Sequence, residues 1–548
     1  MNVLVTGAGP VGLTVALELR RRGVACRLVD RLPEPIPYAK AVGVQPRTME
    51  LWAAAGVLPP VLDEAVPLRG QLVYVDGAEA ARLEFTMPPE VPYGFVALPQ
   101  YETERLLTRR LAELGGAVER GVELVGFEQD ADGVTATLRG PDGEETVRTG
   151  YLVGCDGAHS VVRKGLGLSF EGAAFAEQYM LGDVEVDWSQ PPDYAVRSMR
   201  QHPGEPTDVL VAIPLPGDRR YRMSMLVPDE LSAGGPEHGV EHGFTAGPAP
   251  ELRHIQAVLD RLAPEPTRAS ALRWSSVFRI SHRIVDRYGR GRVFVAGDAA
   301  HIHPPTGAQG MNTGIQDAVA VAWRLALAVE GVAADGLLDS YDAERRPVGE
   351  EVVGRTVRHA REGYDDKDPA TLMLREAQLL VSYPDSPLVG EGAEANAVKV
   401  GPRPGERAPD SRGLRRDSVA FPVRLHEVLD GRRHTLLLFA DRHDQLDGLA
   451  EVARHARAAA HGLLDTRLVL DGGLAVDAAP VVDGVALPTL RDAEGEFRAA
   501  YGAVGGCCYL VRPDGQVGFR AGRAAADELA EHLAHTFREP GGTGHGGG

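Results

Sequence analysis

The chain has 548 residues, of which 44% are apolar and 25% charged, so it is long enough to form two or three globular domains. The net charge of -19 argues against nucleic acid or an anionic membrane as a partner, because both require a basic surface. The four cysteines form no CxxC pair, and no zinc site, signal peptide or membrane span is evident. We therefore expect a cytoplasmic protein without a metal or a membrane anchor.

The N-terminal segment alternates between strand and helix patterns. Asn2–Thr6 is predicted to be a buried strand, Gly12–Arg22 a helix and Ala25–Asp30 the next strand. The turn between the first two elements holds Gly7, Gly9, Pro10, Val11 and Gly12. Such glycines permit a tight turn, let the backbone approach a pyrophosphate and allow close helix packing. The segment predicts a dinucleotide-binding turn.

Two residues at the end of the second strand extend this prediction. Asp30 follows Gly12 by 18 residues, where its carboxylate can accept hydrogen bonds from a ribose diol, and Arg31 is its neighbour. A glycine motif alone is weak evidence, because glycine-rich turns are common. Combined with the flanking strand, the helix and Asp30, it indicates a bound nucleotide but does not separate NAD from FAD.

The next segment continues with mixed elements. Pro46–Ala55 and Glu102–Leu114 are predicted to be amphipathic helices, and Val118–Leu138 is predicted to form strands around a turn. Tyr151–Gly154 is a short apolar strand that leads into Asp156-Gly157.

The pattern changes between Tyr179 and Ser281. Short alternating segments predict an antiparallel sheet, with a helix over Leu252–Leu262. The first pattern then returns with a strand at Val293–Ala296 and two long helices, at Thr313–Glu330 and Leu337–Arg361. A sheet domain inserted between two halves of another domain explains this order.

A third unit is predicted after the Pro/Gly/Arg-rich stretch Val400–Asp410, which is typical of a linker. The unit contains apolar strands at Thr435–Phe439 and Thr466–Leu470, a hairpin over Tyr509–Phe519 and a helix over Ala524–Leu533. Residues 541–548 are glycine-rich and predict a flexible tail.

The segment from Gly297 to Asn312 identifies the nucleotide more closely. Asp298 follows an apolar strand, where its carboxylate can meet the ribityl hydroxyls of a flavin. The glycine-rich run after it contains Pro305, Gly310, Met311 and Asn312 and leads into a helix. Backbone N–H groups at its end are expected to face the pyrimidine edge of an isoalloxazine ring, which becomes anionic on reduction.

These motifs together resemble a known family. The N-terminal glycines, the run from Asp156 to Arg163 and Gly297-Asp298 are similar to the three fingerprints of the class A flavoprotein aromatic hydroxylases, and Val44–Glu50 and Leu98–Glu104 resemble its polyketide hydroxylase branch. The resemblance implies an α/β fold: a Rossmann-like FAD-binding domain with an inserted antiparallel-sheet substrate domain and a C-terminal thioredoxin-like domain. The expected boundaries are 1–178 and 282–397 for the two halves of the first domain, 179–281 for the insert and 398–540 for the last domain.

The resemblance also implies roles for single residues. Arg47 and Gln100 are expected to contact the ribityl–phosphate region of FAD. Asp156 and Gly157 are expected in a loop shared by FAD and NADPH binding, which Arg163 braces. Each of these residues also has a purely structural explanation, such as a helix cap or a salt bridge.

No catalytic residue is assigned, because the flavin performs the chemistry; the candidates are His303, Pro304 and Pro305. His301 and His303 suit acid–base chemistry, but histidines in such a loop more often fix the backbone. The roles of Asp183 and His282 stay open. Cys507 and Cys508 are expected to be core residues of the thioredoxin-like unit, because adjacent strand residues point to opposite faces.

The implied activity is a monooxygenase reaction. NADPH or NADH would act as a transient co-substrate, and FAD and O2 would form the C4a-hydroperoxide that hydroxylates a polycyclic aromatic polyketide or related phenol. A Baeyer–Villiger oxygenation, a flavin reductase or dehydrogenase, and a non-catalytic FAD-binding protein stay open as alternatives. A monomer and a homodimer are both compatible with the sequence.

Overall fold

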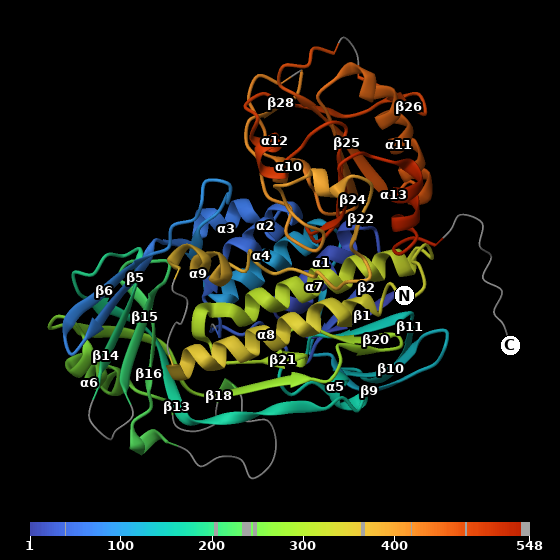
Figure 1. Cartoon of the computed structure of the whole chain (residues 1–548). Coiled ribbons are helices and arrows are strands. Elements are labelled where there is room, and N and C mark those ends of the chain that lie inside the picture. Colours follow the sequence, from blue (N-terminus) through green and yellow to red (C-terminus); the bar gives the residue numbers. More distant parts are fainter. Residues whose placement is uncertain are drawn as a thin grey trace.

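The computed structural model describes residues 1–38, 40–201, 207–232, 243–244, 249–362, 368–417, 419–476 and 479–538. Figure 1 shows three parts: a central α/β region, a sheet lobe to its lower left and a C-terminal domain above it. The predicted tail at 541–548 lies outside the described residues. Within them, no helix combines the length and apolar character that crossing a bilayer requires.

The central region is built on a largely parallel sheet with the strand order β19-β20-β12-β1-β2-β8. Its strands are β1 (Val3–Thr6), β2 (Cys26–Asp30), β8 (Val118–Arg120), β12 (Tyr151–Gly154), β19 (Gly289–Arg290) and β20 (Val293–Val295). The pairing of β12 with β20 joins the two halves of the domain that flank the predicted insertion. This sheet is the Rossmann-like core that the sequence predicted.

Helices pack on this sheet through apolar faces. The helices of the central region are α1 (Pro10–Arg21), α2 (Pro46–Ala55), α3 (Leu58–Glu64), α4 (Gln100–Glu113), α5 (Val161–Gly165), α7 (Gln309–Val329), α8 (Ser340–Glu362) and α9 (Pro369–Glu376). α1 begins two residues before the prediction because Pro10, whose fixed φ suits the first helical position, starts it. Smaller antiparallel sheets join β9 (Glu123–Gln129), β10 (Val134–Gly140) and β11 (Gly143–Thr149), and β3 (Gly43–Val44), β4 (Val66–Leu68) and β7 (Phe95–Ala97).

The sheet lobe is larger than the predicted insert. Its sheet contains β5 (Gly70–Val75), β6 (Ala78–Glu84), β13 (Phe170–Asp187), β14 (Tyr194–Arg200), β15 (Asp208–Pro214), β16 (Arg220–Leu226), β17 (Gly243–Phe244), β18 (Arg268–Val285) and β21 (His301–Ile302). β5 joins by pairing in parallel with β14, a long-range contact that local patterns do not reveal. α6 (Leu252–Leu262) covers one face of the sheet and has the predicted bounds.

The C-terminal domain has a sheet with the strand order β22-β30-β29-β24-β25-β28-β23. Its strands are β22 (Gly390–Glu391), β23 (Leu414–Arg415), β24 (His434–Ala440), β25 (Leu464–Asp471), β28 (Thr489–Asp492), β29 (Cys508–Val511) and β30 (Val517–Ala521), beside the small pair β26 (Val481–Val482) and β27 (Val485–Ala486). Its helices are α10 (Leu425–Val428), α11 (Leu446–Ala459), α12 (Glu496–Tyr501) and α13 (Ala526–Leu533).

The two adjacent cysteines of this domain belong to its core. Cys507 and Cys508 are both fully buried and lie in different hydrophobic clusters, on opposite faces of the sheet. Burial raises the pKa of Cys507 to about 11 and that of Cys508 further, which keeps both thiols protonated at neutral pH. This arrangement confirms the structural interpretation of the pair.

The stretch Val400–Asp410 is not a free linker. The backbone N–H of Gly405 donates to the carbonyl of Val517 (2.7 Å), and that of Ala408 donates to the carbonyl of Gly515 (2.9 Å). The stretch is therefore packed along the hairpin that β29 and β30 form.

The same hairpin inserts charged side chains into the central region. Arg512 contacts Glu344 of α8 (2.6 Å) and Asp514 (2.5 Å), and Arg324 of α7 also pairs with Glu344 (2.5 Å). Glu344 and Arg324 have no exposed surface, and Arg512 is 2% exposed. Buried charges are tolerated only when they are paired, so this cluster fixes the C-terminal domain to α7 and α8.

Replacing Arg512 with Met should therefore lower the free energy of unfolding by about 3–5 kcal/mol, because Glu344 and Asp514 lose a shared buried partner. The matched control is Arg523→Met, which removes an exposed ion pair with Glu394 (3.5 Å) and should cost less than about 1 kcal/mol. Denaturant-induced unfolding of both variants measures the difference. Equal effects would show that the cluster does not hold the domains together.

Candidate functional site

The turn after β1 is shaped by glycines at two positions. Gly7 has φ +91°, and a Cβ there would lie 2.3 Å from the carbonyl oxygen of Cys155. A Cβ at Gly12 would lie 1.9 Å from the carbonyl oxygen of Gly7. By contrast, a Cβ at Gly9 would meet only one atom within 4 Å, Oε1 of Glu104 at 4.0 Å. Gly9 therefore borders open space at the N-terminus of α1, where free N–H groups favour an anion.

Asp30 lies beside this turn. Its Oδ2 accepts a hydrogen bond from the backbone N–H of Ala8 (2.6 Å), and its Oδ1 accepts one from Leu32 (2.8 Å). A carboxylate has about four acceptor positions, so both oxygens can accept a further hydrogen bond. The carboxylate is thus held rigidly while it still faces the cavity next to Arg31.

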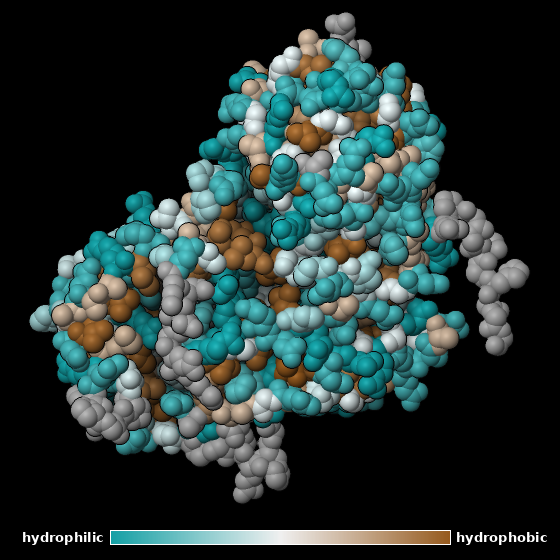
Figure 2. Space-filling model, viewed as in Figure 1, coloured by the Kyte–Doolittle hydropathy of each residue, from teal (hydrophilic) through white to brown (hydrophobic). Residues whose placement is uncertain are grey.

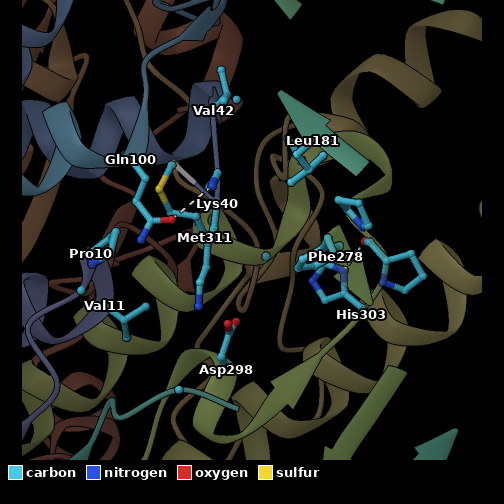
Figure 3. A pocket seen from close by; sticks show the side chains of 18 of the residues that line it. Pro10, Val11, Lys40, Val42, Gln100, Leu181, Phe278, Asp298, His303 and Met311 are labelled. Atoms are coloured by element: carbon cyan, nitrogen blue, oxygen red, sulfur yellow. Dashed lines mark hydrogen bonds between the residues drawn. The ribbon is translucent and has the colours of Figure 1, made fainter. Parts of the chain in front are cut away.

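A cavity of about 1250 Å³ joins the glycine turn to the sheet lobe. Figure 3 shows Pro10, Val11 and Gln100 on one side of it and Phe278 and Leu181 on the other. Of the predicted site residues, those that line the cavity are Gly7, Gly9, Pro10, Val11, Asp30, Arg31, Gln100, Asp156, Gly157, Asp298, His303, Pro304, Pro305, Gly310 and Met311. Segments that are far apart in the chain therefore form one site.

The wall between the two halves is the loop that precedes α7. Gly307 (φ +70°) and Ala308 (φ +54°) both adopt the left-handed conformation, which turns the chain sharply into the helix. Gln45 stabilises this turn, since its side-chain amide donates to the carbonyl of Gly307 (2.8 Å). The turn leaves Gly310 and Met311, in the first turn of α7, facing the cavity.

A buried carboxylate on α7 holds the start of this wall. Asp317 accepts hydrogen bonds from the backbone N–H of Gly297 (3.1 Å) and from Arg345 Nε (2.7 Å), and it contacts His301 Nε2 (2.8 Å). Burial alone would raise the pKa of Asp317, but Arg345 and His301 lower it below its ordinary value. His301 thus contacts the carboxylate that holds the backbone of Gly297, which agrees with the structural role that the sequence favoured.

Asp156 has a similar internal role at the opposite wall. Its carboxylate accepts hydrogen bonds from the Ser160 hydroxyl (2.5 Å) and from the backbone N–H of Val161 (2.7 Å), and burial raises its pKa. Arg163 braces the loop as expected, because its Nη2 donates to the carbonyl of Ala158 (2.7 Å), and its Nη1 links the loop to the carbonyl of Ala299 (3.2 Å). The guanidinium also lies over the ring of Phe170, 3.9 Å from its centroid.

Arg47 and Asn312 are not among the residues that line the cavity. Arg47 pairs with Glu50 (2.8 Å) and donates to the carbonyl of Asp514, so it joins α2 to the C-terminal domain, and its expected cofactor contact stays a prediction. The Asn312 side chain is fully buried and bonds to Gln45 and Thr48 (3.0 and 2.7 Å). The side-chain amide of Asn312 also donates to the carbonyls of Gly43 and Ala308, so its hydrogen bonds are internal, and the expected contact of its backbone N–H with the flavin stays a prediction.

Gly12 and Gly297 also lie behind the cavity surface rather than on it. Gly297 has φ +61°, and a Cβ there would lie 2.8 Å from Cγ2 of Val11. Both glycines therefore allow close packing behind the site and do not themselves line it.

The residues whose roles the sequence left undecided contact other residues of the protein. Asp183 pairs with Arg222 in the sheet lobe (2.5 Å), and His282 packs against Phe175 with ring centroids 5.6 Å apart. His303 is 7% exposed, and its Nδ1 lies 2.8 Å from the carbonyl oxygen of Pro304. His303 is the only one of these residues that was proposed for catalysis, and it lies at the junction of the two halves of the cavity.

Some site residues had no signal in the sequence. Lys40 and His359 line the cavity, as does Glu376, whose pKa is raised by burial. Glu376 Oε2 accepts a hydrogen bond from the Gln309 amide (3.0 Å), and its other oxygen contacts Arg355 (2.6 Å). Only Asp317, an acid within a long apolar helix pattern, could have been noticed from the sequence.

The residues that line the site fit FAD. The elongated cavity begins at the glycine turn, where Gly9 leaves room for a pyrophosphate, and Asp30 and Asp298 offer carboxylates for ribose and ribityl hydroxyls. Arg31 and Lys40 line the same end beside Asp30 and Asp298, so basic groups suited to phosphates and carboxylates suited to hydroxyls lie close together there.

Replacing single glycines of the turn should affect FAD binding at one position and the stability of the fold at another. Gly9→Ala should leave the apoprotein as stable as before but weaken FAD binding at least tenfold, about 1.4 kcal/mol, because the new methyl group occupies the space for the pyrophosphate. Gly12→Ala should instead lower the melting temperature, since its Cβ meets backbone. Flavin titration and thermal unfolding of the apoproteins provide the readouts. Full flavin affinity in Gly9→Ala would place the pyrophosphate elsewhere.

Asp298→Ala should reduce FAD affinity by about 10- to 100-fold, because it removes a charged hydrogen-bond acceptor worth about 1.5–3 kcal/mol. Flavin content after gel filtration and a dissociation constant from fluorescence titration test this. Asp385→Ala, at an exposed position away from the cavity, is the control. Unchanged affinity in Asp298→Ala would remove Asp298 from the site.

Comparison with known proteins agrees with this geometry. Residues 1–356 match the family described as FAD binding domain. A flavin-dependent monooxygenase of Mycobacteroides abscessus is 35% identical over 80% of this chain and 88% of its own length. The 12-dehydrotetracycline 5-monooxygenase/anhydrotetracycline 6-monooxygenase of Streptomyces rimosus is 34% identical over 98% and 99%.

Solved structures are similar over nearly the whole chain. The flavin-dependent monooxygenase PieE in complex with FAD and substrate has a TM-score of 0.79 at 25% identity and covers 97% of this chain and 98% of its own. Aklavinone-11 hydroxylase with FAD and aklavinone has a TM-score of 0.76 at 28% identity, with the same coverage. The chain therefore belongs to the class A FAD-dependent aromatic hydroxylases and is an FAD-binding monooxygenase.

Proposed function

We propose that this enzyme hydroxylates a polycyclic aromatic polyketide or a related phenol, with NADPH or NADH and O2 as co-substrates. Its relatives include proteins named 6-methylpretetramide 4-monooxygenase and aklavinone 12-hydroxylase, each covered over most of its length. Both names describe oxygenation of polycyclic polyketides, which supports the same substrate class here.

The observation that carries the proposal is the continuity of the cavity. Its nucleotide end carries both acidic and basic side chains, whereas its other end lies against the nine-stranded sheet and is largely apolar, with Leu181, Phe278 and Ile280 among its lining residues. Aromatic ring systems bind well to such a surface, because burying apolar area is favourable and rings stack on rings. The loop containing His303 and the first turn of α7, which carries Met311, separate the two ends (Figure 3).

Bound FAD supplies the redox chemistry, since flavins accept hydride from nicotinamide and activate O2. The chain's own contribution is to position the ring system and to exclude water. Pro304 and Pro305, which lack N–H groups, and the fixed ring of His303 form a rigid surface at the junction.

The test is consumption of NADPH by the FAD-loaded enzyme with a panel of polycyclic phenols, with and without O2. A substrate should accelerate NADPH oxidation in air and yield a product that carries one oxygen atom from labelled O2. Turnover that continues without O2 would contradict the proposal and favour a reductase. An altered carbon skeleton in the product would identify a Baeyer–Villiger reaction instead.

A further inference from the structure

Two arginines project from the sheet into the apolar half of the cavity. Arg222 lies on β16 and Arg197 on β14, and both line the cavity. The other cavity-facing positions of these strands and of β15 between them are Ala195, Ser224, Leu226, Val209, Val211 and Ile213. Two cationic groups therefore stand among neutral side chains.

The charge of Arg222 is balanced within the protein. Its Nε and Nη2 donate to the two carboxylate oxygens of Asp183 on the neighbouring strand, at 2.5 and 3.2 Å. Both side chains are at most 5% exposed. This bidentate pair leaves Arg222 as a neutral, rigid part of the sheet.

Arg197 lacks such a balance. Its cross-strand neighbours are Val211 on β15 and Val73 on β5, neither of which can accept a hydrogen bond through its side chain. Its Nε is enclosed and has no hydrogen-bond partner, and no carboxylate in the described part of the chain lies within ion-pairing distance of it. Glu177 lines the same cavity but is exposed and forms no ion pair with Arg197.

A guanidinium that is partly desolvated without a counter-ion is costly, so its presence in an apolar cavity calls for an anionic partner. We propose that Arg197 binds a carboxylate on the substrate, so that the preferred substrate is an aromatic polyketide acid. This inference rests on the proposed function, since it names the substrate class of the same cavity. A planar guanidinium suits a carboxylate because two parallel N–H groups match its two oxygens.

The register of the sheet sets the distance between this group and the reacting ring. Leu181, Ser224, Val211 and Arg197 are successive cross-strand neighbours on β13, β16, β15 and β14. Three strand spacings separate the first from the last, about 14 Å. Leu181 lies near Phe278 and His303 at the junction with the nucleotide half (Figure 3). A tetracyclic skeleton anchored at Arg197 would thus place its opposite end at the junction, which makes Arg197 a specificity and positioning residue.

The experiment compares a dihydroxyanthraquinone carboxylate with its primary carboxamide, which has nearly the same shape but no charge, and with the parent dihydroxyanthraquinone, which lacks the substituent. Their dissociation constants are measured by fluorescence titration of the FAD-loaded enzyme. The carboxylate should bind the wild-type enzyme about 10- to 100-fold more tightly than the carboxamide, as expected for a charge-assisted hydrogen-bonded pair. Arg197→Met should abolish this preference, and Arg197→Lys should retain part of it.

The matched control is Arg200→Met. Arg200 lies on the same strand and carries the same charge, but it is three residues away, on the opposite face, and does not line the cavity. The variant should keep the full preference for the carboxylate. Equal preferences in wild-type and Arg197→Met enzymes, or no binding of the carboxylate to the wild type, would overturn the inference.

The readouts also separate this inference from the proposed function. A charge preference that depends on Arg197, found in an enzyme that never hydroxylates these ligands, would support the subsite and count against the activity. Hydroxylation of the carboxamide and the carboxylate with equal KM would support the activity and contradict the subsite.

Discussion

The site depends on one buried carboxylate, that of Asp317. It joins the backbone of Gly297, the ring of His301 and the guanidinium of Arg345, and so ties the strand that ends at Val295 to α7 and α8. Arg345 in turn donates to the carbonyl of Thr313 and to the hydroxyl of Tyr383. Because every member is almost completely buried, the network has one satisfied arrangement, and the loop that carries Asp298 and His303 inherits its rigidity.

The elements that were predicted well are those whose signals are local. The strand Tyr151–Gly154 and the helices Pro46–Ala55 and Leu252–Leu262 have the predicted bounds, since their apolar periodicity is strong. The lobe boundaries were predicted less well, because β5 enters the sheet through a parallel partner more than a hundred residues away and because Glu171–Ala174 of β13 lacks alternation.

The residues on the cofactor side of the site could also be predicted, because their signals are local. Gly7 permits a close backbone approach and Asp30 follows a strand, and both features can be recognised from the neighbouring residues in the sequence. The contact of Arg47 with the C-terminal domain could not be predicted, because its partner is a carbonyl in a hairpin more than four hundred residues away. Arg197 had no signal at all, since an unpaired charge is defined by neighbours that only the folded sheet brings together. Local chemistry identifies the cofactor, and only tertiary contacts identify the substrate pocket.

The hairpin between β29 and β30 has a consequence for protein engineering. Its Arg512 and Asp514 complete a charge cluster with Arg324 and Glu344, which belong to the central region. The thioredoxin-like domain is thus no independent module, although it lies above the rest of the molecule in Figure 1 and faces solvent on its outer side (Figure 2). Chimeras that exchange this domain between related hydroxylases would have to transfer the hairpin together with the two helices that receive it, or else redesign the four charges as one unit.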